Sequence, residues 1–444
     1  MHHFAAIRTT LQKLAGNDSR AATLVNLALT LAIMLFVIWR MPEFLVEPRF
    51  WAEEGSNYFA FAYSHSWLEN LLYPQFGYYT LYNSLATSLA ASFPLHYSAY
   101  VTTYLALSVQ VAVSAAAIWW RIPVLDSLFK RIVVAFAIQF LAYARIWATT
   151  IGVQYWLCVL SVLILLSETG TERSFQRNLR RGLLVLNGLT GILSCCLIPA
   201  FILAWRGNRC RETLNRALIL AGCLVVQTGV YVSAVVQSDP GLSSRLLCTN
   251  LPAMLARFFH FQFVIPFFGH VVWNSALARQ LEAGIVGLLQ PFTGNSIYSY
   301  KYSILQQLSG FAVFAFLVVA VFKTGKRIET RIMVMAFASI AFVANLFSVN
   351  TSGGPRYTFA PSIIVMIFLV SITGWQEAGP FLRRTALALV LIAVVMCDYR
   401  ATMVFAFSPS WPALRQELAM WQANPSHEIR LWPPPFVMKL EPRP

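Results

Sequence analysis

Runs of about 20 apolar residues recur along the whole chain, and a run of that length spans the hydrocarbon core of a bilayer as a helix. Of the 444 residues, 58% are hydrophobic and only 11% are charged, whereas a soluble domain carries about 25% charged residues. This scarcity of charge excludes a soluble globular enzyme, a disordered chain and a small disulfide scaffold. The sequence predicts an all-α, polytopic membrane helical bundle of about 10–12 membrane segments.

The net charge of +15 does not indicate nucleic-acid binding, because the basic residues form short clusters between apolar runs. Such clusters mark the inside-facing loops of membrane proteins. With the N-terminus inside, the inside segments are 1–20, 121–131, 168–181, 206–216, 323–331 and 375–384. The candidate spans are 21–39, 98–120, 131–148, 152–167, 182–205, 217–236, 307–322, 332–349, 360–374 and 385–398.

Two apolar segments do not fit a simple crossing. Segment 77–92 is short and contains several tyrosine, threonine and asparagine residues, so it predicts an interfacial or re-entrant helix. Segment 182–205 lies between two basic loops that both belong inside. Because Pro199 removes a helix hydrogen bond, we expect this segment to break into two half-helices that enter and leave on the same side.

The resulting membrane domain, 1–398, has two sizeable outside loops, 40–97 and 238–306. In the second loop, the aromatic stretches at 258–261 and 266–268 predict helices that lie on the membrane surface. The proline-rich tail 399–444 is long enough for a small cap, but too short for an independent enzyme domain.

The most distinctive chemical feature is an acidic pair, Glu53 and Glu54, in an aromatic stretch soon after the first span. Arg49 lies nearby. Apolar surroundings raise the pKa of a carboxyl group and suit it to proton abstraction, and paired acids are also compatible with a bound divalent cation. The alternative is an ordinary solvated loop.

Basic residues in the outside segments complement this pair. Arg145 closes one predicted span, and Arg356 follows two glycines and a proline and precedes Tyr357. The planar guanidinium suits phosphate oxygens, and a tyrosine adds a hydroxyl donor. The alternative for both arginines is snorkelling at the interface. In the second loop, the residues suited to phosphate or sugar binding are His260, His270 and Lys301, although a structural role is the simpler interpretation of each.

These features together resemble the GT-C superfamily of integral-membrane glycosyltransferases. The segment RFWAEEG at 49–55 is similar to the FWAEDG segment of bacterial members, a tyrosine-rich segment follows at 73–82, and a late outside Arg-Tyr pair lies in 355–357. The resemblance in the order of spans and loops covers most of the chain, whereas the matching motifs cover only a few residues. The sequence contains no P-loop, HExxH or GxSxG motif, so it does not predict nucleotide hydrolysis or these hydrolase chemistries.

The resemblance implies a donor sugar on a polyprenyl phosphate, a catalytic acid in the first outside loop, and inversion at the anomeric carbon. The acid would be Glu54 or Glu53; we favour Glu54, because an aromatic residue, Tyr58, follows four positions later. Many members have Asp at this position, so the Glu-Glu pair leaves the choice open. Arg356 would bind the leaving phosphate, and Arg145 is a second candidate.

The resemblance also implies a bacterial inner-membrane location with a cytoplasmic N-terminus and a periplasmic active site. The acceptor would be a cell-envelope glycan or lipid. No cofactor is required, and whether a divalent cation binds is left open. The expected partners are the sugar donor, the acceptor and membrane lipids. No nucleic-acid partner is expected. Further substrate contacts are expected from Arg49, Trp51, Tyr58, His260 and Lys301.

Two other functions stay open. An O-antigen polymerase or ligase would use a polyprenyl-diphosphate donor and basic residues of the second loop, where Arg257, His260 and His270 lie. A flippase for lipid-linked sugars, or another transporter, would need no catalytic acid.

Overall fold

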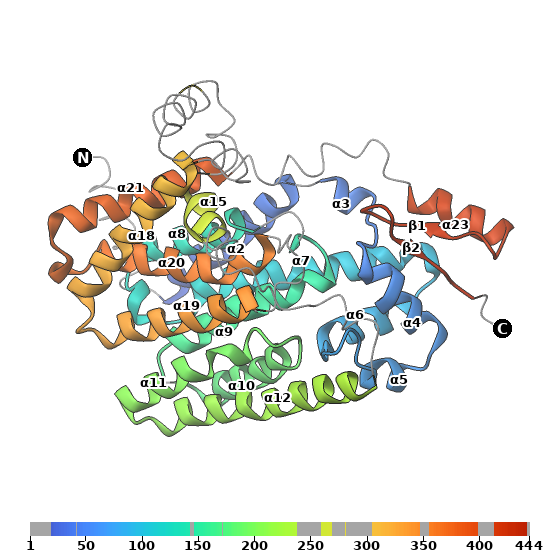
Figure 1. Cartoon of the computed structure of the whole chain (residues 1–444), viewed down its shortest axis with the longest axis horizontal. Coiled ribbons are helices and arrows are strands. Elements are labelled where there is room, and N and C mark those ends of the chain that lie inside the picture. Colours follow the sequence, from blue (N-terminus) through green and yellow to red (C-terminus); the bar gives the residue numbers. More distant parts are fainter. Residues whose placement is uncertain are drawn as a thin grey trace, which may run out of the picture.

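The computed structural model describes residues 19–40, 42–142, 146–170, 172–237, 259–268, 280, 304–346, 355–397 and 413–441. Within these residues the chain is almost entirely helical, and helices such as α12 and α19 run along the long axis of the molecule (Figure 1). The predicted all-α bundle is therefore confirmed.

Five helices in the described part of the chain are long and apolar enough to cross a membrane, which indicates an integral membrane protein. They are α2 (Ser19–Arg40), α7 (Leu95–Trp119), α12 (Arg211–Val236), α18 (Ile304–Thr324) and α21 (Gly379–Cys397). A further helix, α19 (Ile328–Leu346), packs against α11 (Ile198–Asn208) and α20 (Phe359–Ile372).

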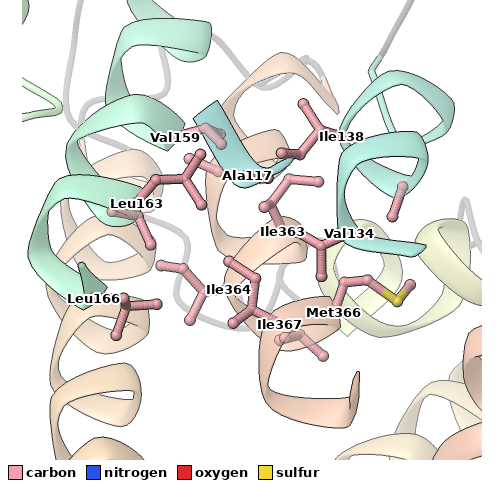
Figure 2. Close-up of a cluster of buried hydrophobic side chains, with 14 of the residues drawn as sticks. Ala117, Val134, Ile138, Val159, Leu163, Leu166, Ile363, Ile364, Met366 and Ile367 are labelled. Carbon is pink, nitrogen blue, oxygen red and sulfur yellow. The ribbon is translucent and has the colours of Figure 1, made fainter. Parts of the chain in front are cut away.

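The centre of the bundle is formed by helices too short to cross a bilayer as straight segments. Helices α9 (Val153–Leu166) and α20 each have 14 residues, or about 21 Å. All 14 residues of α20 are buried. Figure 2 shows Ile363 and Ile364 of α20 among side chains of α9, such as Leu163, and of α8 (Leu128–Phe140), such as Val134. These short helices form the main core.

The predicted span 131–148 is too long, because α8 ends at Phe140. The chain then leaves the helix, and a 3-10 turn, η4 (Thr150–Gly152), leads directly into α9. The described apolar residues between α8 and η4 are buried without belonging to an α-helix, which hydropathy does not distinguish from a continued span. Trp147, for example, is fully buried.

The predicted break in 182–205 is confirmed. Helix α10 (Ser174–Gly188) and helix α11 are separate, and Pro199 lies in the first turn of α11, where its missing N–H costs little. Arg216 near the start of α12 donates to both Glu172 carboxylate oxygens, at 2.6 and 2.7 Å. Glu172 precedes α10 and α12 follows α11, so the half-helices begin and end at the same end of the bundle.

The other basic junctions lie at that end too, which we call the basic end. Arg121 pairs with Glu168 at 2.9 Å, and Arg181 pairs with Glu212. The Ser371 hydroxyl at the end of α20 donates to the Val124 carbonyl oxygen at 3.3 Å, which joins α20 to the same group of junctions.

The opposite end, the acidic end, carries the first outside loop. Its short elements are α3 (Glu43–Val46), η1 (Glu54–Phe59), α4 (Ala60–Ser64), α5 (Trp67–Leu72) and α6 (Leu81–Ala91). With 11 residues, or about 16 Å, α6 cannot cross a bilayer, in agreement with the prediction for 77–92. Its polar side chains are buried; Ser88, for example, accepts a 2.8 Å hydrogen bond from Asn70.

The described part of the tail, 413–441, forms a small cap at the acidic end (Figure 1). It contains α23 (Leu414–Ala423) and a two-stranded antiparallel sheet of β1 (Ile429–Arg430) and β2 (Val437–Met438). Leu431 and Trp421 of the cap share a hydrophobic cluster with Phe50 and Phe59 of the first outside loop. The cap therefore packs on this loop.

The predicted second outside loop, 238–306, is described only at 259–268, 280 and 304–306. There a π-helix, η6 (His260–Val264), continues into α15 (Ile265–Phe268) and packs against α18 and α21. Phe263 and Phe267 are each 1% exposed. The prediction that these aromatic stretches lie on the membrane surface is wrong for the described residues, which are buried between helices.

Candidate functional site

The two adjacent glutamates occupy different environments in the turn formed by residues 51–54, which we call the acidic turn. Glu54 is 1% exposed, and its Oε1 atom accepts hydrogen bonds from the Thr150 N–H at 2.7 Å and hydroxyl at 2.6 Å. Its Oε2 atom accepts from the Trp51 N–H at 3.1 Å. Burial raises the pKa of Glu54, and these hydrogen bonds act against the increase. This carboxyl group is a buried anchor.

Glu53 remains partly exposed, because the backbone reverses direction just before it. Ala52 has a φ of +46°, in the left-handed region that non-glycine residues seldom adopt. Its N–H donates to the Trp432 carbonyl oxygen at 2.7 Å, and the Glu54 N–H donates to the Trp51 carbonyl oxygen at 2.9 Å. The turn therefore directs one carboxyl group inward and leaves the next accessible.

Arg356 lies close to this accessible carboxyl group, although the two residues are far apart in the sequence. It belongs to η8 (Pro355–Thr358), directly before α20. Its guanidinium interacts electrostatically with Tyr155, Tyr357 and Glu53. The guanidinium carbon is 5.1 Å from the Tyr357 ring centroid, and Nη2 is 3.4 Å from the Tyr357 hydroxyl oxygen.

Three tyrosines, Tyr78, Tyr155 and Tyr357, interact with Arg356 or with one another, and we call them the tyrosine cluster. The rings of Tyr155 and Tyr357 meet edge to face, with centroids 5.7 Å apart. Tyr155 also interacts electrostatically with Tyr78. A carboxylate, a guanidinium and three phenols from separate segments therefore converge at the acidic end.

The helix elements explain how these groups meet. Glu54 is bound to Thr150 in η4, and η4 leads into α9, whose first turn carries Tyr155. The anchor therefore places the acidic turn beside the start of α9. Arg356 arrives at the same place because α20 packs along α9 in the core.

The turn between the half-helices α10 and α11 supports Tyr78. The N–H of Gly191 in this turn donates to the Tyr79 carbonyl oxygen at 3.1 Å. Gly191 has a φ of +96°, in the left-handed range that glycine adopts readily and other residues seldom do. Gln227 of α12 holds Tyr79 from the other side, through 2.9 Å hydrogen bonds to its N–H and its carbonyl oxygen.

The cap holds the acidic turn from outside. Besides the Trp432 hydrogen bond, Leu431 packs so closely that a Cβ atom on Gly55 would lie 2.7 Å from its Cδ1 atom. The buried Glu417 carboxylate organises the cap by accepting hydrogen bonds from the Arg430 N–H at 2.9 Å and from His427 at 3.1 Å. Burial alone would raise the pKa of Glu417, but these hydrogen bonds lower it.

Several residues expected to contact substrate are placed elsewhere. Trp51 and Tyr58 are 6% and 2% exposed, so they are too buried for the substrate contacts expected of them; they pack within the loop. His260 is 3% exposed, because η6 lies between helices. Arg49 donates to Glu47 at 2.8 Å and is partly buried. The candidates that lie outside the described residues are Arg145, Arg257, His270 and Lys301.

The sequence reasoning missed Thr150, Tyr155 and Trp432. A signal for the first was present: Thr149 and Thr150 interrupt the apolar residues between two predicted spans. No local signal pointed to Trp432, whose backbone oxygen, not its side chain, makes the contact with the acidic turn.

The two glutamates do not fit a shared divalent-cation site, because both oxygens of Glu54 already accept hydrogen bonds from Thr150 and Trp51. Within the described ranges, no group of three or more His, Cys, Asp or Glu side chains is arranged to hold a metal ion.

No protein-family model matches this chain, and neither a curated protein nor a solved structure matches it.

Proposed function

We propose that this chain is a membrane glycosyltransferase of the bacterial inner membrane, with its active site at the acidic end facing the periplasm. It would move a sugar from a polyprenyl phosphate to a cell-envelope glycan or lipid. The observation that supports the proposal is that the Arg356 guanidinium, beside Tyr155 and Tyr357, lies within electrostatic range of the partly exposed Glu53. A base and an anion-binding guanidinium are the two groups that this transfer requires.

Glu53 is the general base in this proposal, in place of the Glu54 favoured from the sequence. Its partly exposed carboxylate is accessible to an acceptor hydroxyl, whereas Glu54 is anchored by three hydrogen bonds. Glu53 takes the hydroxyl proton as the acceptor oxygen bonds to the anomeric carbon. The bond between that carbon and the phosphate oxygen breaks with its electron pair, and the configuration inverts.

Arg356 binds the phosphate and stabilises the charge that develops as it leaves. The hydroxyl of Tyr357 lies within reach of the guanidinium and holds the arginine in place. Electrostatic stabilisation of developing charge is commonly the largest catalytic contribution. Glu53 then releases its proton to water or to the departing phosphate, which restores the enzyme.

The direct test uses purified protein in lipid vesicles with a labelled polyprenyl-phosphate sugar and lipopolysaccharide as acceptor. We expect Glu53→Gln to lower kcat for transfer by about 10²–10⁴-fold and Arg356→Lys to lower it by about 10²–10³-fold. Glu47→Gln is the matched control, because Glu47 is an exposed acid of the same loop, and it should leave the rate unchanged.

Retained transfer in Glu53→Gln would contradict the assignment of the base. Transbilayer movement of the lipid-linked sugar without any glycoside product would instead indicate a flippase. Activity that requires a polyprenyl diphosphate would indicate a polymerase or ligase.

A further inference from the structure

A groove of ≈ 740 Å³ begins immediately after the acidic turn. Ser56 and Asn57, one helical turn beyond Glu53, line its start, and Ser64 and His65 line its far end. Residues 56–64 cover about 12 Å of helix. The groove is therefore longer than a single sugar ring, and its lining begins at Ser56, shortly after Glu53, the residue to which we assign the base.

A second groove of ≈ 510 Å³ continues in the same direction. It shares Ser64, His65 and the cap residue Glu441 with the first groove and extends past Trp67 to Ser88 and Ser92. The two grooves form one path along η1 and α4, with the cap as one wall. We call this path the long groove.

Two exposed aromatic rings are held in fixed orientations along the long groove. Tyr73 is 51% exposed and stacks on Phe61, with ring centroids 4.3 Å apart. Phe61 is stacked in turn with His65 at 3.8 Å. Trp67 is 48% exposed, and its indole N–H donates to Ser92 at 3.0 Å. Ordered tyrosine and tryptophan rings offer contact area at a low entropic cost.

The rest of the lining suits hydroxyl groups more than hydrocarbon. It carries the side chains of Ser56, Asn57, Ser64, Gln75 and Lys439. Small hydroxyl and amide groups next to aromatic rings can hydrogen-bond the edge of a sugar ring while an aromatic ring packs on its face. A lipid acyl chain would offer these polar side chains no hydrogen-bond partner.

We propose that the long groove binds an extended, uncharged oligosaccharide chain, which makes the acceptor a glycan rather than a simple lipid. This inference rests on the proposed function for the identity of the reaction. The end of the glycan would lie at Asn57, beside Glu53, and its preceding sugars would pack on Tyr73 and then on Trp67.

The test measures binding to the whole protein in nanodiscs, with maltohexaose, cellohexaose and chitohexaose as probes and the corresponding monosaccharides as references. We expect at least one hexasaccharide to bind about tenfold or more tightly than its monosaccharide. Tyr73→Ala and Trp67→Ala should each weaken that binding by about tenfold, or about 1.4 kcal/mol. Tyr73→Phe and Trp67→Phe keep the rings and should retain most of it.

Phe175→Ala is the control for loss of an exposed aromatic ring, because Phe175 is 76% exposed and belongs to α10 at the basic end. The proposal is overturned if no probe shows a preference for the longer chain, or if both alanine variants bind as the unmodified protein does. Binding of the glycan without sugar transfer would leave the groove intact and contradict the proposed function. Sugar transfer that does not depend on Tyr73 or Trp67 would support the proposed function and contradict the assignment of the long groove to the glycan.

Discussion

The N–H of Ala52 donates a 2.7 Å hydrogen bond to the carbonyl oxygen of Trp432, and this contact joins the acidic turn to the cap. Ala52 adopts a left-handed backbone conformation that costs about 1–3 kcal/mol unless its surroundings compensate. The cap provides that compensation. Substitutions at the contact between the turn and the cap therefore affect the placement of Glu53 without touching it.

Gly55→Ala is expected to disturb this contact. The new Cβ atom would meet Leu431 at 2.7 Å and Phe50 at 2.8 Å, and such overpacking costs about 1–3 kcal/mol. We expect a lower melting temperature and slower transfer, measured by thermal unfolding and by the vesicle assay. Combining it with Leu431→Ala removes the closest contact and should recover part of the loss. A double variant worse than the sum of both changes would contradict this explanation.

Thr150→Val tests the anchoring of Glu54. The change removes the hydroxyl that donates at 2.6 Å and leaves a buried carboxylate with fewer donors, which costs about 1–3 kcal/mol. We expect reduced stability and a lower kcat at similar KM, because the acidic turn loses its fixed position. Thr150→Ser keeps the donor and should behave nearly as the unmodified protein; equal damage from both substitutions would exclude the hydroxyl as the cause.

The cap should loosen at acidic pH. The pKa of Glu417 is lower in the folded protein than in the unfolded chain, where it is about 4.3. Its contribution to stability is complete above that unfolded value and disappears as the pH falls through the lower folded value. Hydrogen exchange of the amides at 429–438 measures this opening. In Glu417→Gln the ionisation is absent, so the acid-induced increase in exchange should shrink; an unchanged increase would assign it to another group.

Glu172 and Arg216 should show strong energetic coupling at the basic end. Their side chains are 5% and 1% exposed and form two hydrogen bonds. Removing one partner of a buried pair costs about 3–5 kcal/mol. Glu172→Gln and Arg216→Gln together should cost about 1–3 kcal/mol less than the sum of the single changes. Unfolding measurements of the four variants test this, and additive costs would show that the pair is not coupled.

Hydropathy and charge predicted the helical bundle, the non-crossing segment 77–92 and the break near Pro199. These features depend on local composition, so they can be recognised from neighbouring residues. The early end of α8 at Phe140 could not be recognised in the same way. Buried non-helical segments and buried helices are equally apolar, and hydropathy cannot separate them.

The roles of the two glutamates could not be predicted from their identity or spacing. Glu53 and Glu54 differ because Thr150, far along the chain, donates to only one of them. The same applies to Trp51, which was expected to contact substrate but is buried and paired with Trp432 of the cap. In both cases a long-range contact determines the environment, and such contacts carry no local sequence signature.

The pairing of Ala52 with Trp432 also has a consequence for biosynthesis. A growing polypeptide displays both glutamates early, yet Trp432, which secures their turn, emerges from the ribosome long after them. Contacts between such distant positions form late and slowly. The acidic turn would thus reach its final geometry only once the cap, 413–441, has been synthesised, and a truncated product without this segment would insert into the membrane with the turn unsecured.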